Sequence, residues 1–454
     1  MEHERSTLQQ SDARGRGADS GAAAVPGLLR VLCAGSAMAT ALPLDGALLL
    51  GRGAAALGTD QDPRMSRSHA QVRYDGRRFW VTDQGSQNGT FVDGAPLVAG
   101  TPREAQRVIR MGDSLFIPCP DVGPVARRGV ARTRDFVRGP AMQQLLDLVA
   151  RTAEHGFTLH IHGESGTGKE GVARAFHERG PRASGPFVAV NCAAIPQGLA
   201  ERLLFGARRG AFSGADDAEG YLQAADGGTL FLDEVAELDL GVQAKLLRAL
   251  ETREVLPLGG SKPRKVDVRV CSAGNKDLRA QVASGRMRED LYFRLGRPEA
   301  DLPPLRRRPE ELPFLVERFL EEVGSRLPVH VSFHEACLLR AWPGNVRELR
   351  VEVRSAAHEA LLHEAPRLEA RHLSLTAGTV FGPPPPAPAV VASSTSEQSP
   401  ARGKPLDEAE RARLEDALRA NGGNVAATAR ALGMHRTQLR RLLERHGLAG
   451  SGEG

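Results

Sequence analysis

The chain has 454 residues, of which 41% are hydrophobic and 25% charged, and its net charge at pH 7 is +5. This length allows about three domains, and no apolar run approaches the roughly 20 residues that cross a bilayer, so a membrane protein is excluded. The net charge permits nucleic-acid binding without requiring it. The cysteines stand singly, with no metal-ligand spacing, which excludes a disulfide scaffold and indicates reduced thiols in the cytoplasm: Cys33, Cys119, Cys192, Cys271 and Cys337.

Residues 1–26 are polar and contain no apolar segment of the kind found in signal peptides. They predict a disordered tail. Residues 27–122 then contain short β-prone runs separated by Gly, Asp and Asn, such as ALLLGRG, HAQVRYDG and DSLFIP. This spacing predicts a small all-β sandwich.

Three pieces of this first region share one pattern: Gly51-Arg52, SRSHA from Ser66, and DQGSQNGTFVDG from Asp83. Together they resemble a forkhead-associated (FHA) domain, which implies binding of a phosphothreonine. A guanidinium, a hydroxyl and an amide suit a phosphate and its peptide backbone. The resemblance implies that His69 is structural and that four residues form the site: Arg52, Ser66, Arg67 and Asn88.

The alternative is a purely structural sandwich, because Asn-Gly pairs such as Asn88-Gly89 are common in hairpin turns. Ser68 stands where the family often has a basic residue, which should weaken the positive rim of the site. The phosphopeptide interpretation implies two partners, a phosphothreonine-bearing protein and its Ser/Thr kinase.

From about 132 to 376, strands alternate with helical patterns, which predicts an α/β domain with a helical lid from about residue 305. The octapeptide GESGTGKE follows the β-prone run 158–162 and opens a helical pattern, as a phosphate-binding loop does. Its lysine would place a charge near the β- and γ-phosphates. A chance Gly-rich turn is the alternative. The candidate ATP-binding residues are Gly163, Glu164, Ser165, Gly166, Thr167, Gly168, Lys169 and Glu170.

A second nucleotide motif, TLFLDE, begins at Thr229. Its apolar part predicts a strand buried on both faces, and Asp233 and Glu234 would emerge at the carboxyl end, where ligands bind in open α/β sheets. We expect Asp233 to hold Mg²⁺ and Glu234 to orient or deprotonate the attacking water.

Six segments occur in order between Gly163 and Leu349: GESGTGKE, VNCAAIP, GAFSGA, GGTLFLDE, REDLYFRL and WPGNVREL. Together they resemble the AAA+ domain of the sigma-54-dependent activators, the bacterial enhancer-binding proteins. Glu170 agrees with this family, although P-loops in general have Ser or Thr there. The resemblance implies a ring of identical subunits, a hexamer, that hydrolyses ATP between neighbours.

The same resemblance assigns roles to single residues. It implies a switch residue, Asn191, that holds Glu234 until hydrolysis, and a sensor of the γ-phosphate, Asn275. Arginines stabilise the charge that phosphoryl transfer spreads over the γ-oxygens, although a single arginine is more often a solvated surface residue. The arginine fingers would be Arg288 and Arg294, and Arg347 would be at the second sensor.

The GAFSGA segment matches the family loop that contacts sigma-54. Its Phe212, flanked by small residues, predicts an exposed anchor on a mobile loop. The candidate contact residues are Gly210, Ala211, Phe212, Ser213, Gly214 and Ala215. Ser213, Arg208 and Gly274 depart from the family pattern, and the segment FVRGPAM from Phe136 is one residue shorter than usual near the adenine pocket.

Residues 377–404 are rich in Pro and Ser and predict a linker. Three helices are predicted after it, over 406–420, 424–432 and 435–446, with a tight turn at Gly433. The segment from Gly422 to Leu448 resembles a Fis-type helix-turn-helix, so residues 405–454 are the expected DNA-binding domain. A solvated basic face is the alternative. The candidate groove residues are Arg436, Thr437, Gln438, Arg440 and Arg441.

The sequence therefore predicts a cytoplasmic, multidomain transcription activator: an all-β FHA sandwich, an α/β AAA+ ATPase with a helical lid, and a small all-α helix-turn-helix domain. It would bind ATP, Mg²⁺ and an upstream DNA site, and would remodel the closed complex of sigma-54 RNA polymerase. The alternative is a phosphorylation-dependent DNA-binding regulator or scaffold with a slow ATPase that does not engage sigma-54.

Overall fold

A computed structural model of the 454-residue chain describes residues 23–57, 62–133, 136–155, 158–196, 198–211, 216–380, 416–421 and 427–429. The chain divides into two compact units, residues 1–382 and 383–454. The helices within the described ranges include none that is both long enough and apolar enough to span a membrane.

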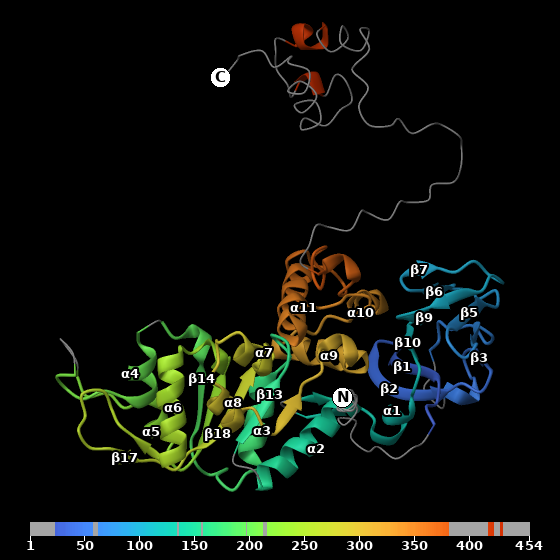
Figure 1. Ribbon diagram of the computed structural model, residues 1–454. Helices are drawn as coiled ribbons and strands as arrows, with labels where there is room; N and C mark the ends of the chain where they lie inside the picture. The colour runs from blue at the N-terminus through green and yellow to red at the C-terminus, as the bar shows by residue number, and fades with distance from the viewer. Residues whose placement is uncertain are drawn as a thin grey trace, which may run out of the picture. The chain divides into compact units, whose positions relative to one another are not determined.

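The first unit begins with a sandwich of two antiparallel sheets, one ordered β2-β1-β10-β9-β6-β7 and the other β3-β4-β5-β8 (Figure 1). Its strands are short and are joined by Gly-, Asp- and Asn-containing turns, as predicted. They are β1 (Gly27–Cys33), β2 (Ser36–Pro43), β3 (Ala47–Leu50), β4 (Ala70–Tyr74), β5 (Phe79–Asp83), β6 (Thr90–Val92), β7 (Ala95–Pro96), β8 (Arg103–Ala105), β9 (Ile109–Met111) and β10 (Ser114–Cys119).

Strand β1 is buried on both faces. In a sandwich with an exposed outer face, only the side facing the other sheet would be buried. Leu28 contributes to the core between the two sheets, whereas Leu29 and Val31 point the other way, into a second core. That second core also contains apolar residues of the helical lid, so the six-stranded sheet is covered by a different part of the chain.

The α/β region is built on a parallel sheet ordered β14-β15-β18-β13-β19. Its strands are β13 (Thr158–His162), β14 (Phe187–Asn191), β15 (Thr229–Asp233), β18 (Arg269–Gly274) and β19 (Glu299–Asp301). Its helices are α2 (Pro140–His155), α3 (Lys169–Glu178), α4 (Ala200–Phe205), α5 (Tyr221–Ala224), α6 (Leu240–Thr252), α7 (Leu278–Ala283) and α8 (Glu289–Leu295). Short elements complete the region: α1 (Gly123–Arg128), β11 (Ala131–Arg132), β12 (Val137–Arg138), β16 (Glu254–Val255) and β17 (Arg264–Lys265).

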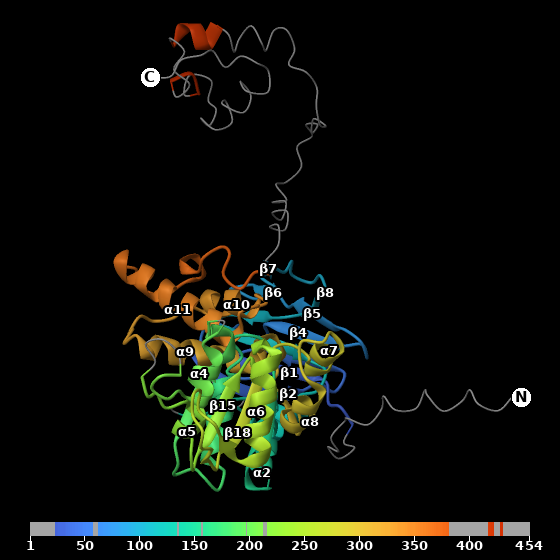
Figure 2. The ribbon, with the colours of Figure 1, turned by 60° about the vertical axis from the view of Figure 1, so that its left-hand side comes forward.

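Alternation along the strands places a separate apolar core on each face of the sheet. Leu159, Ile161 and Phe231 pack with α2 and α3 on one face. Leu230 and Leu232 pack with α4 to α8 on the other. Figure 2 shows α6 in front of β15 and β18 on this second face.

The lid consists of α9 (Leu312–Glu322), α10 (Val331–Leu338) and α11 (Asn345–Leu362). Short 3₁₀ turns lie before these helices (Leu305–Arg307 and Pro309–Glu311) and after them (Ala370–His372). Each helix buries one apolar stripe in the core that it shares with the first sandwich sheet. The lid therefore contacts two modules, the sandwich and the P-loop.

In the second unit, residues 416–420 and 427–429 are helical, within two of the helices predicted there. The tail up to residue 22, the linker from 381 and the five candidate groove residues lie outside the described residues, as do Phe212, Ser213, Gly214 and Ala215 of the predicted sigma-54 loop.

Candidate nucleotide and phosphopeptide sites

The nucleotide motifs meet because they follow neighbouring parallel strands. The P-loop follows β13, Asp233 ends β15, and Asn275 follows β18, which lies between those two strands. The carboxyl ends of parallel strands share one edge of the sheet, where ligands bind. Segments more than 60 residues apart in sequence are thereby brought to one place.

Lys169 is buried at the start of α3, directly after Gly168, whose φ of 104° only glycine adopts easily. Its ammonium donates to the carbonyl oxygen of Gly163 at 3.1 Å and contacts a carboxylate oxygen of Glu234 at 3.3 Å. The lysine is therefore held between the P-loop and the second motif, where it can exchange the carboxylate for a phosphate.

Glu234 has left-handed backbone geometry, with φ 55° and ψ 47°. This conformation is unusual for a residue with a side chain, and such outliers concentrate at functional sites. It turns the carboxylate back over the strand ends, where it accepts from the backbone N–H of Asn275 at 3.2 Å.

Asp233 has a buried carboxylate oxygen, Oδ1, with no hydrogen-bond partner in the described residues. Burial raises the pKa of this carboxyl, while the nearby Lys169 opposes the rise. A desolvated carboxylate oxygen without a partner is suited to a hard cation, which prefers oxygen ligands.

The P-loop is in direct contact with the lid. Gly166 has a φ of 77°, and a Cβ atom there would lie 2.1 Å from the carbonyl oxygen of Gly344. Only glycine therefore allows the loop to pass this close to the WPGN segment. Arg347 completes the contact, because its backbone N–H donates to Gly166 and its guanidinium donates to the Ser165 hydroxyl at 3.2 Å.

Glu164 is clamped by the lid. Arg306 donates to both of its carboxylate oxygens, at 2.6 and 2.8 Å, and Asn345 donates to one of them at 3.2 Å. The Arg306 guanidinium is the main reason that the pKa of Glu164 lies below its usual value. Neither lid residue belonged to the predicted site.

A buried ion pair at the start of the lid contacts both the P-loop and the segment before α2. Arg308 and Glu311 are 3.0 Å apart, and both side chains are almost fully buried. Arg308 also donates to the carbonyl oxygen of Thr167, and Glu311 accepts from the backbone N–H of Gly139. The run RRRPEEL supplied a signal for this pair, since buried arginine and glutamate occur mainly as partners.

Beside the P-loop lies a cavity of about 560 Å³, a volume typical of small-molecule sites. Phe136 and Val137 line one side, Gly168 and Gly171 of the P-loop helix another, and Val346 of the lid a third. The FVRGPAM segment thus contributes its apolar side chains to this cavity.

The remaining predicted nucleotide residues each contact residues outside the P-loop. Asn191 accepts from the N–H of Ala193, and no hydrogen bond joins it to Glu234 in the described ranges. Arg288 forms a two-pronged ion pair with Asp290, and Arg294 donates to the carbonyl oxygen of Leu250. Glu170 pairs with Arg174 on the exposed face of α3.

The stem of the predicted sigma-54 loop is ordered by backbone bonds between Ala207 and Ala218, each donating to the other at 2.9 Å. Arg208 lies 3.6 Å from Asp217 across this stem. Gly210 and Ala211 are the predicted contact residues that the structure describes. A Cβ atom at Gly274 would lie 3.7 Å from the Glu234 carboxylate, which is an ordinary van der Waals contact.

The predicted phosphopeptide residues come together at one end of the sandwich. The backbone N–H of Arg52 donates to the carbonyl oxygen of Ser66, and Asn88 donates to the carbonyl oxygen of Arg64 at 2.7 Å. The Ser66 hydroxyl accepts from the N–H of Gln87. Arg67 is exposed beside them.

His69 is fully buried beneath these loops. One ring nitrogen accepts from the N–H of Ser66, and the other lies 3.2 Å from the carbonyl oxygen of Gly89. Burial lowers its pKa. A neutral imidazole that donates to Gly89 and accepts from Ser66 holds the two predicted binding loops together.

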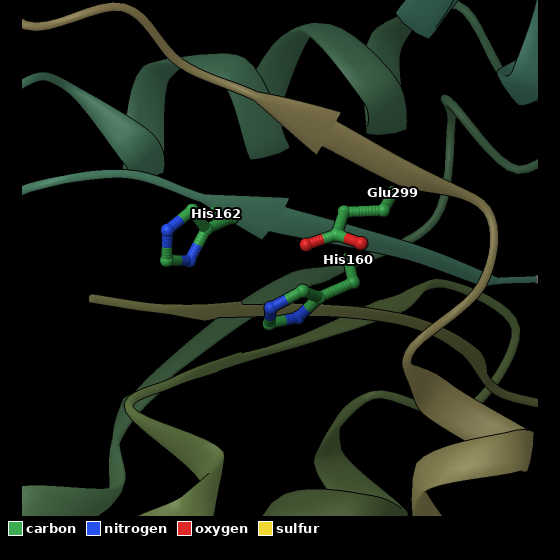
Figure 3. Close-up of side chains that lie close together, drawn as sticks. All are labelled: His160, His162 and Glu299. Carbon is green, nitrogen blue, oxygen red and sulfur yellow. The ribbon is translucent and has the colours of Figure 1, made fainter. Parts of the chain in front are cut away.

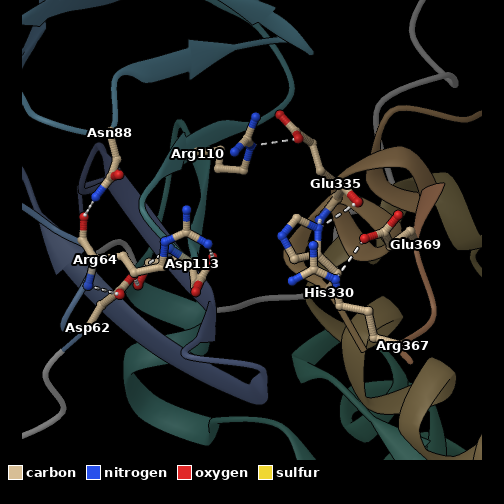
Figure 4. Close-up of polar contacts among 11 residues, drawn as sticks. Asp62, Arg64, Asn88, Arg110, Asp113, His330, Glu335, Arg367 and Glu369 are labelled. Carbon is tan, nitrogen blue, oxygen red and sulfur yellow. Dashed lines mark hydrogen bonds and ion pairs between the residues drawn. The ribbon is translucent and has the colours of Figure 1, made fainter. Parts of the chain in front are cut away.

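The sandwich and the lid also share polar contacts (Figure 4). Arg110 of β9 and Glu335 of α10 form an ion pair at 2.7 Å, largely withdrawn from solvent. Arg64, whose carbonyl oxygen holds Asn88, pairs with Asp113 within the sandwich. The pair of Arg110 and Glu335 therefore joins the sandwich to the lid by a direct polar contact.

Four family models match the chain. They are the Sigma-54 interaction domain over residues 136–299, the AAA+ ATPase lid domain over 306–378, the FHA domain over 48–112, and the bacterial regulatory protein, Fis family, over 405–446. The transcriptional regulatory protein FlbD of Caulobacter vibrioides is 38% identical over 368 residues, covering 78% of this chain and 80% of FlbD. The chain belongs to the sigma-54-dependent transcriptional activators.

Other members of this family support the same assignment. The DNA-binding transcriptional regulator NtrC of Escherichia coli K12 is 39% identical to this chain over 349 residues, which cover 70% of this chain and 71% of NtrC. The crystal structure of NtrX from Brucella abortus in complex with ADP is 33% identical, with a TM-score of 0.51, covering 68% of this chain and 67% of NtrX. The multidomain prediction of an FHA sandwich, an AAA+ domain with a lid and a helix-turn-helix is therefore confirmed.

Proposed function

We propose that this activator hydrolyses ATP in a homo-oligomeric ring and uses the energy to remodel the closed complex of sigma-54 RNA polymerase at promoters with an upstream DNA site. The observation that carries the proposal is the meeting of Lys169, Asp233 and Glu234 beside a lid arginine, Arg347, and a cavity of small-molecule size. These groups suit a triphosphate at the P-loop.

In this proposal each residue has a separate task. Lys169 transfers its contact from Glu234 to the phosphates, which frees the carboxylate to orient the attacking water. Asp233 would hold Mg²⁺, which would neutralise charge on the phosphate oxygens. Arg288 and Arg294 are exposed on α8, as residues that act on a neighbouring subunit must be. Asn191 and Asn275 stand at the strand ends beside Glu234.

The test is a native-gel assay of the full-length protein with sigma-54, ADP and aluminium fluoride. We expect a trapped complex with the wild type and none with Phe212→Ala, whose ATP hydrolysis should be retained. Leu375→Ala, which truncates an exposed apolar residue elsewhere, is the control. Hydrolysis without a trapped complex in the wild type would favour the scaffold alternative.

We further propose that the FHA domain regulates the motor by binding a phosphothreonine on a partner, supplied by a Ser/Thr kinase. The support is the convergence of Arg52, Ser66 and Asn88 at one end of the sandwich, together with the apolar core and the ion pair of Arg110 and Glu335 that join the sandwich to the lid. Binding at the loops would therefore act on the element that also contacts the P-loop.

Phosphothreonine peptide binding, measured by fluorescence anisotropy with a peptide library, tests this step. Arg52→Ala should abolish binding, because a guanidinium to phosphate contact is lost. Arg78→Ala removes an arginine from the turn between β4 and β5 and should bind normally. Equal affinity of both variants would place the phosphate elsewhere.

A further inference from the structure

Three side chains with metal-ligating atoms meet on β13, the strand that leads into the P-loop, and on its neighbour β19. The proposed ATPase chemistry uses none of them. They are His160, His162 and Glu299, and one ligand atom from each lies within 4.8 Å of the other two. Figure 3 shows the two imidazole rings and the carboxylate turned toward one another.

Strand geometry explains why they meet. His160 and His162 are two positions apart on β13, so they point to the same face of the sheet. Glu299 is the register partner of His160 on the neighbouring strand β19. Ligands that project from two adjacent strands are held more rigidly than ligands on loops.

The surroundings of the cluster differ from the rest of that sheet face. On β15 and β18 the same face carries Leu230, Leu232 and Val270, which fill an apolar core. At β13 the two histidines instead border a cavity of about 290 Å³, to which Tyr292 and Arg279 also contribute. This part of the sheet face therefore borders a cavity with polar lining residues, whereas the part at β15 and β18 is covered by aliphatic side chains.

Hydrogen bonds define the tautomer of His160, whose side chain is 1% exposed. The Ser272 hydroxyl donates to the carbonyl oxygen of Leu295, so it accepts from Nδ1 of His160, 2.9 Å away. The proton is then on Nδ1, and Nε2 carries a lone pair. Nε2 is buried and has no partner in the described part of the chain.

The other two groups are also available. Nδ1 of His162 is buried and has no partner among the described residues. The Glu299 carboxylate forms an ion pair with the Arg297 guanidinium at 3.3 Å, and the Arg297 side chain is 54% exposed and can turn to solvent. A carboxylate that ligates a metal commonly keeps such a second contact.

We propose that His160, His162 and Glu299 bind a zinc ion, with the fourth position open to the cavity. Two imidazole nitrogens and one carboxylate oxygen form a set that zinc takes with an open site. The Ser272 hydroxyl is the outer partner that orients the buried imidazole. Zinc bonds of about 2.1 Å separate tetrahedral ligand atoms by roughly 3.4 Å, so side-chain rotations must close the cluster by about an ångström.

This site differs from the proposed Mg²⁺ site at Asp233, because imidazole favours transition metals and a lone carboxylate favours Mg²⁺. Zinc would join β13, and with it the start of the P-loop, to the edge strand β19. We therefore expect zinc to raise the melting temperature of the nucleotide-free protein.

The experiment is titration of the tag-free, nucleotide-free, full-length protein with Zn²⁺ by calorimetry and with Co²⁺ by visible absorption. We expect one ion per chain and visible d–d bands typical of a four-coordinate site. Glu299→Gln and His162→Gln should each weaken Zn²⁺ binding by about a hundredfold, and His155→Gln, an exposed histidine 85% accessible, should leave it unchanged.

A further variant separates ligation from packing. Ser272→Ala keeps all three ligands and should weaken Zn²⁺ binding by about tenfold to a hundredfold, because the imidazole loses its orienting bond. Unchanged affinity in the Glu299 and His162 variants would overturn the proposal. So would a near-ultraviolet thiolate-to-cobalt band, which would place the ion on cysteine, or the absence of binding in the wild type.

Discussion

The lid contacts the P-loop and the FHA sandwich through two surfaces of different chemistry. Its contact with the P-loop is polar: Arg306 on Glu164, Arg347 on Ser165, and Arg308 on the carbonyl oxygen of Thr167. Its contact with the sandwich is mainly a continuous apolar core, to which β1 and β10 contribute from one side and α9 and α10 from the other.

The difference separates two mechanical roles. Polar contacts are directional, and a ligand that offers new charges can replace them one at a time. An apolar core is non-directional and is lost only when surfaces separate. We infer that the P-loop junction rearranges with the nucleotide, whereas the sandwich moves with the lid as one body. Five predictions test this comparison.

Arg308→Met should have the largest effect. It leaves Glu311 buried and uncompensated, which costs about 3–5 kcal/mol. We expect a much lower melting temperature and weaker ATP binding, measured by scanning fluorimetry and nucleotide titration. Arg371→Met removes an exposed lid arginine that pairs with Glu369, outside the cavity beside the P-loop, and is the matched control. Equal melting temperatures would show that the buried pair does not hold the junction.

Leu115→Ala tests the apolar junction. Leu115 is fully buried on the lid side of β10, and such truncations cost about 2–5 kcal/mol. Calorimetry should show the sandwich unfolding before the lid, with nucleotide affinity unchanged. Leu50→Ala removes an equally buried leucine from the inner sandwich core, so it should destabilise the sandwich without exposing the lid to proteolysis.

A charge exchange at Arg110 and Glu335 measures the ion pair that joins the sandwich to the lid. Arg110→Glu and Glu335→Arg should each lower stability, and the double variant should recover about 0.5–3 kcal/mol of coupling. The readout is the free energy of unfolding of the wild type, the two single variants and the double variant, measured by chemical denaturation at the first unfolding transition and combined in a double-mutant cycle. Strict additivity would mean that the two side chains do not interact in solution.

Glu310 is buried at the start of the lid and makes the stability of the folded protein depend on pH. Burial raises its pKa from the usual value of 4.5 to about 7. A raised pKa means that its stabilising contribution is complete below 4.5 and is lost as pH rises through about 7. Stability should therefore decline across this window, and Glu310→Gln should flatten the decline, with its largest stabilisation at pH 8. The measurement is the melting temperature of the wild type and of Glu310→Gln from pH 5 to 8. The same slope in both proteins would show that Glu310 does not cause the pH dependence.

Arg306→Ala should have the smallest effect. Its pair with Glu164 is partly exposed, and such pairs contribute about 0.2–1 kcal/mol. We expect ATP affinity to change by no more than about fivefold, with an unchanged melting temperature. A larger loss would mean that this clamp is needed to shape the P-loop.

Local motifs account for what could be predicted. GESGTGKE and TLFLDE contain both the residues and the backbone features, such as the glycines at 166 and 168, that their conformations need. Parallel-sheet topology then places Lys169 and Glu234 together, so the centre of the nucleotide site was foreseeable. The FHA loops were predicted from the resemblance to that family, and Arg52, Ser66 and Asn88 lie at one end of the sandwich as the resemblance implied.

Long-range partners could not be predicted. Nothing near Glu164 in sequence indicates that Arg306 and Asn345, more than 140 residues away, will hold it. The expected contact of Asn191 with Glu234 is absent from the described bonds, where Lys169 and Asn275 hold that carboxylate instead. The roles assigned to single site residues remain predictions.

The sequence by itself determined the kind of modules in this activator and their order, because periodicity and turn chemistry act over a few residues. Only the tertiary structure decided how the modules meet, since packing depends on surfaces assembled from distant segments. The shared core of sandwich and lid is one case. The other is the group of His160, His162 and Glu299, which exists because β13 pairs with β19, a neighbour more than 130 residues later in the chain.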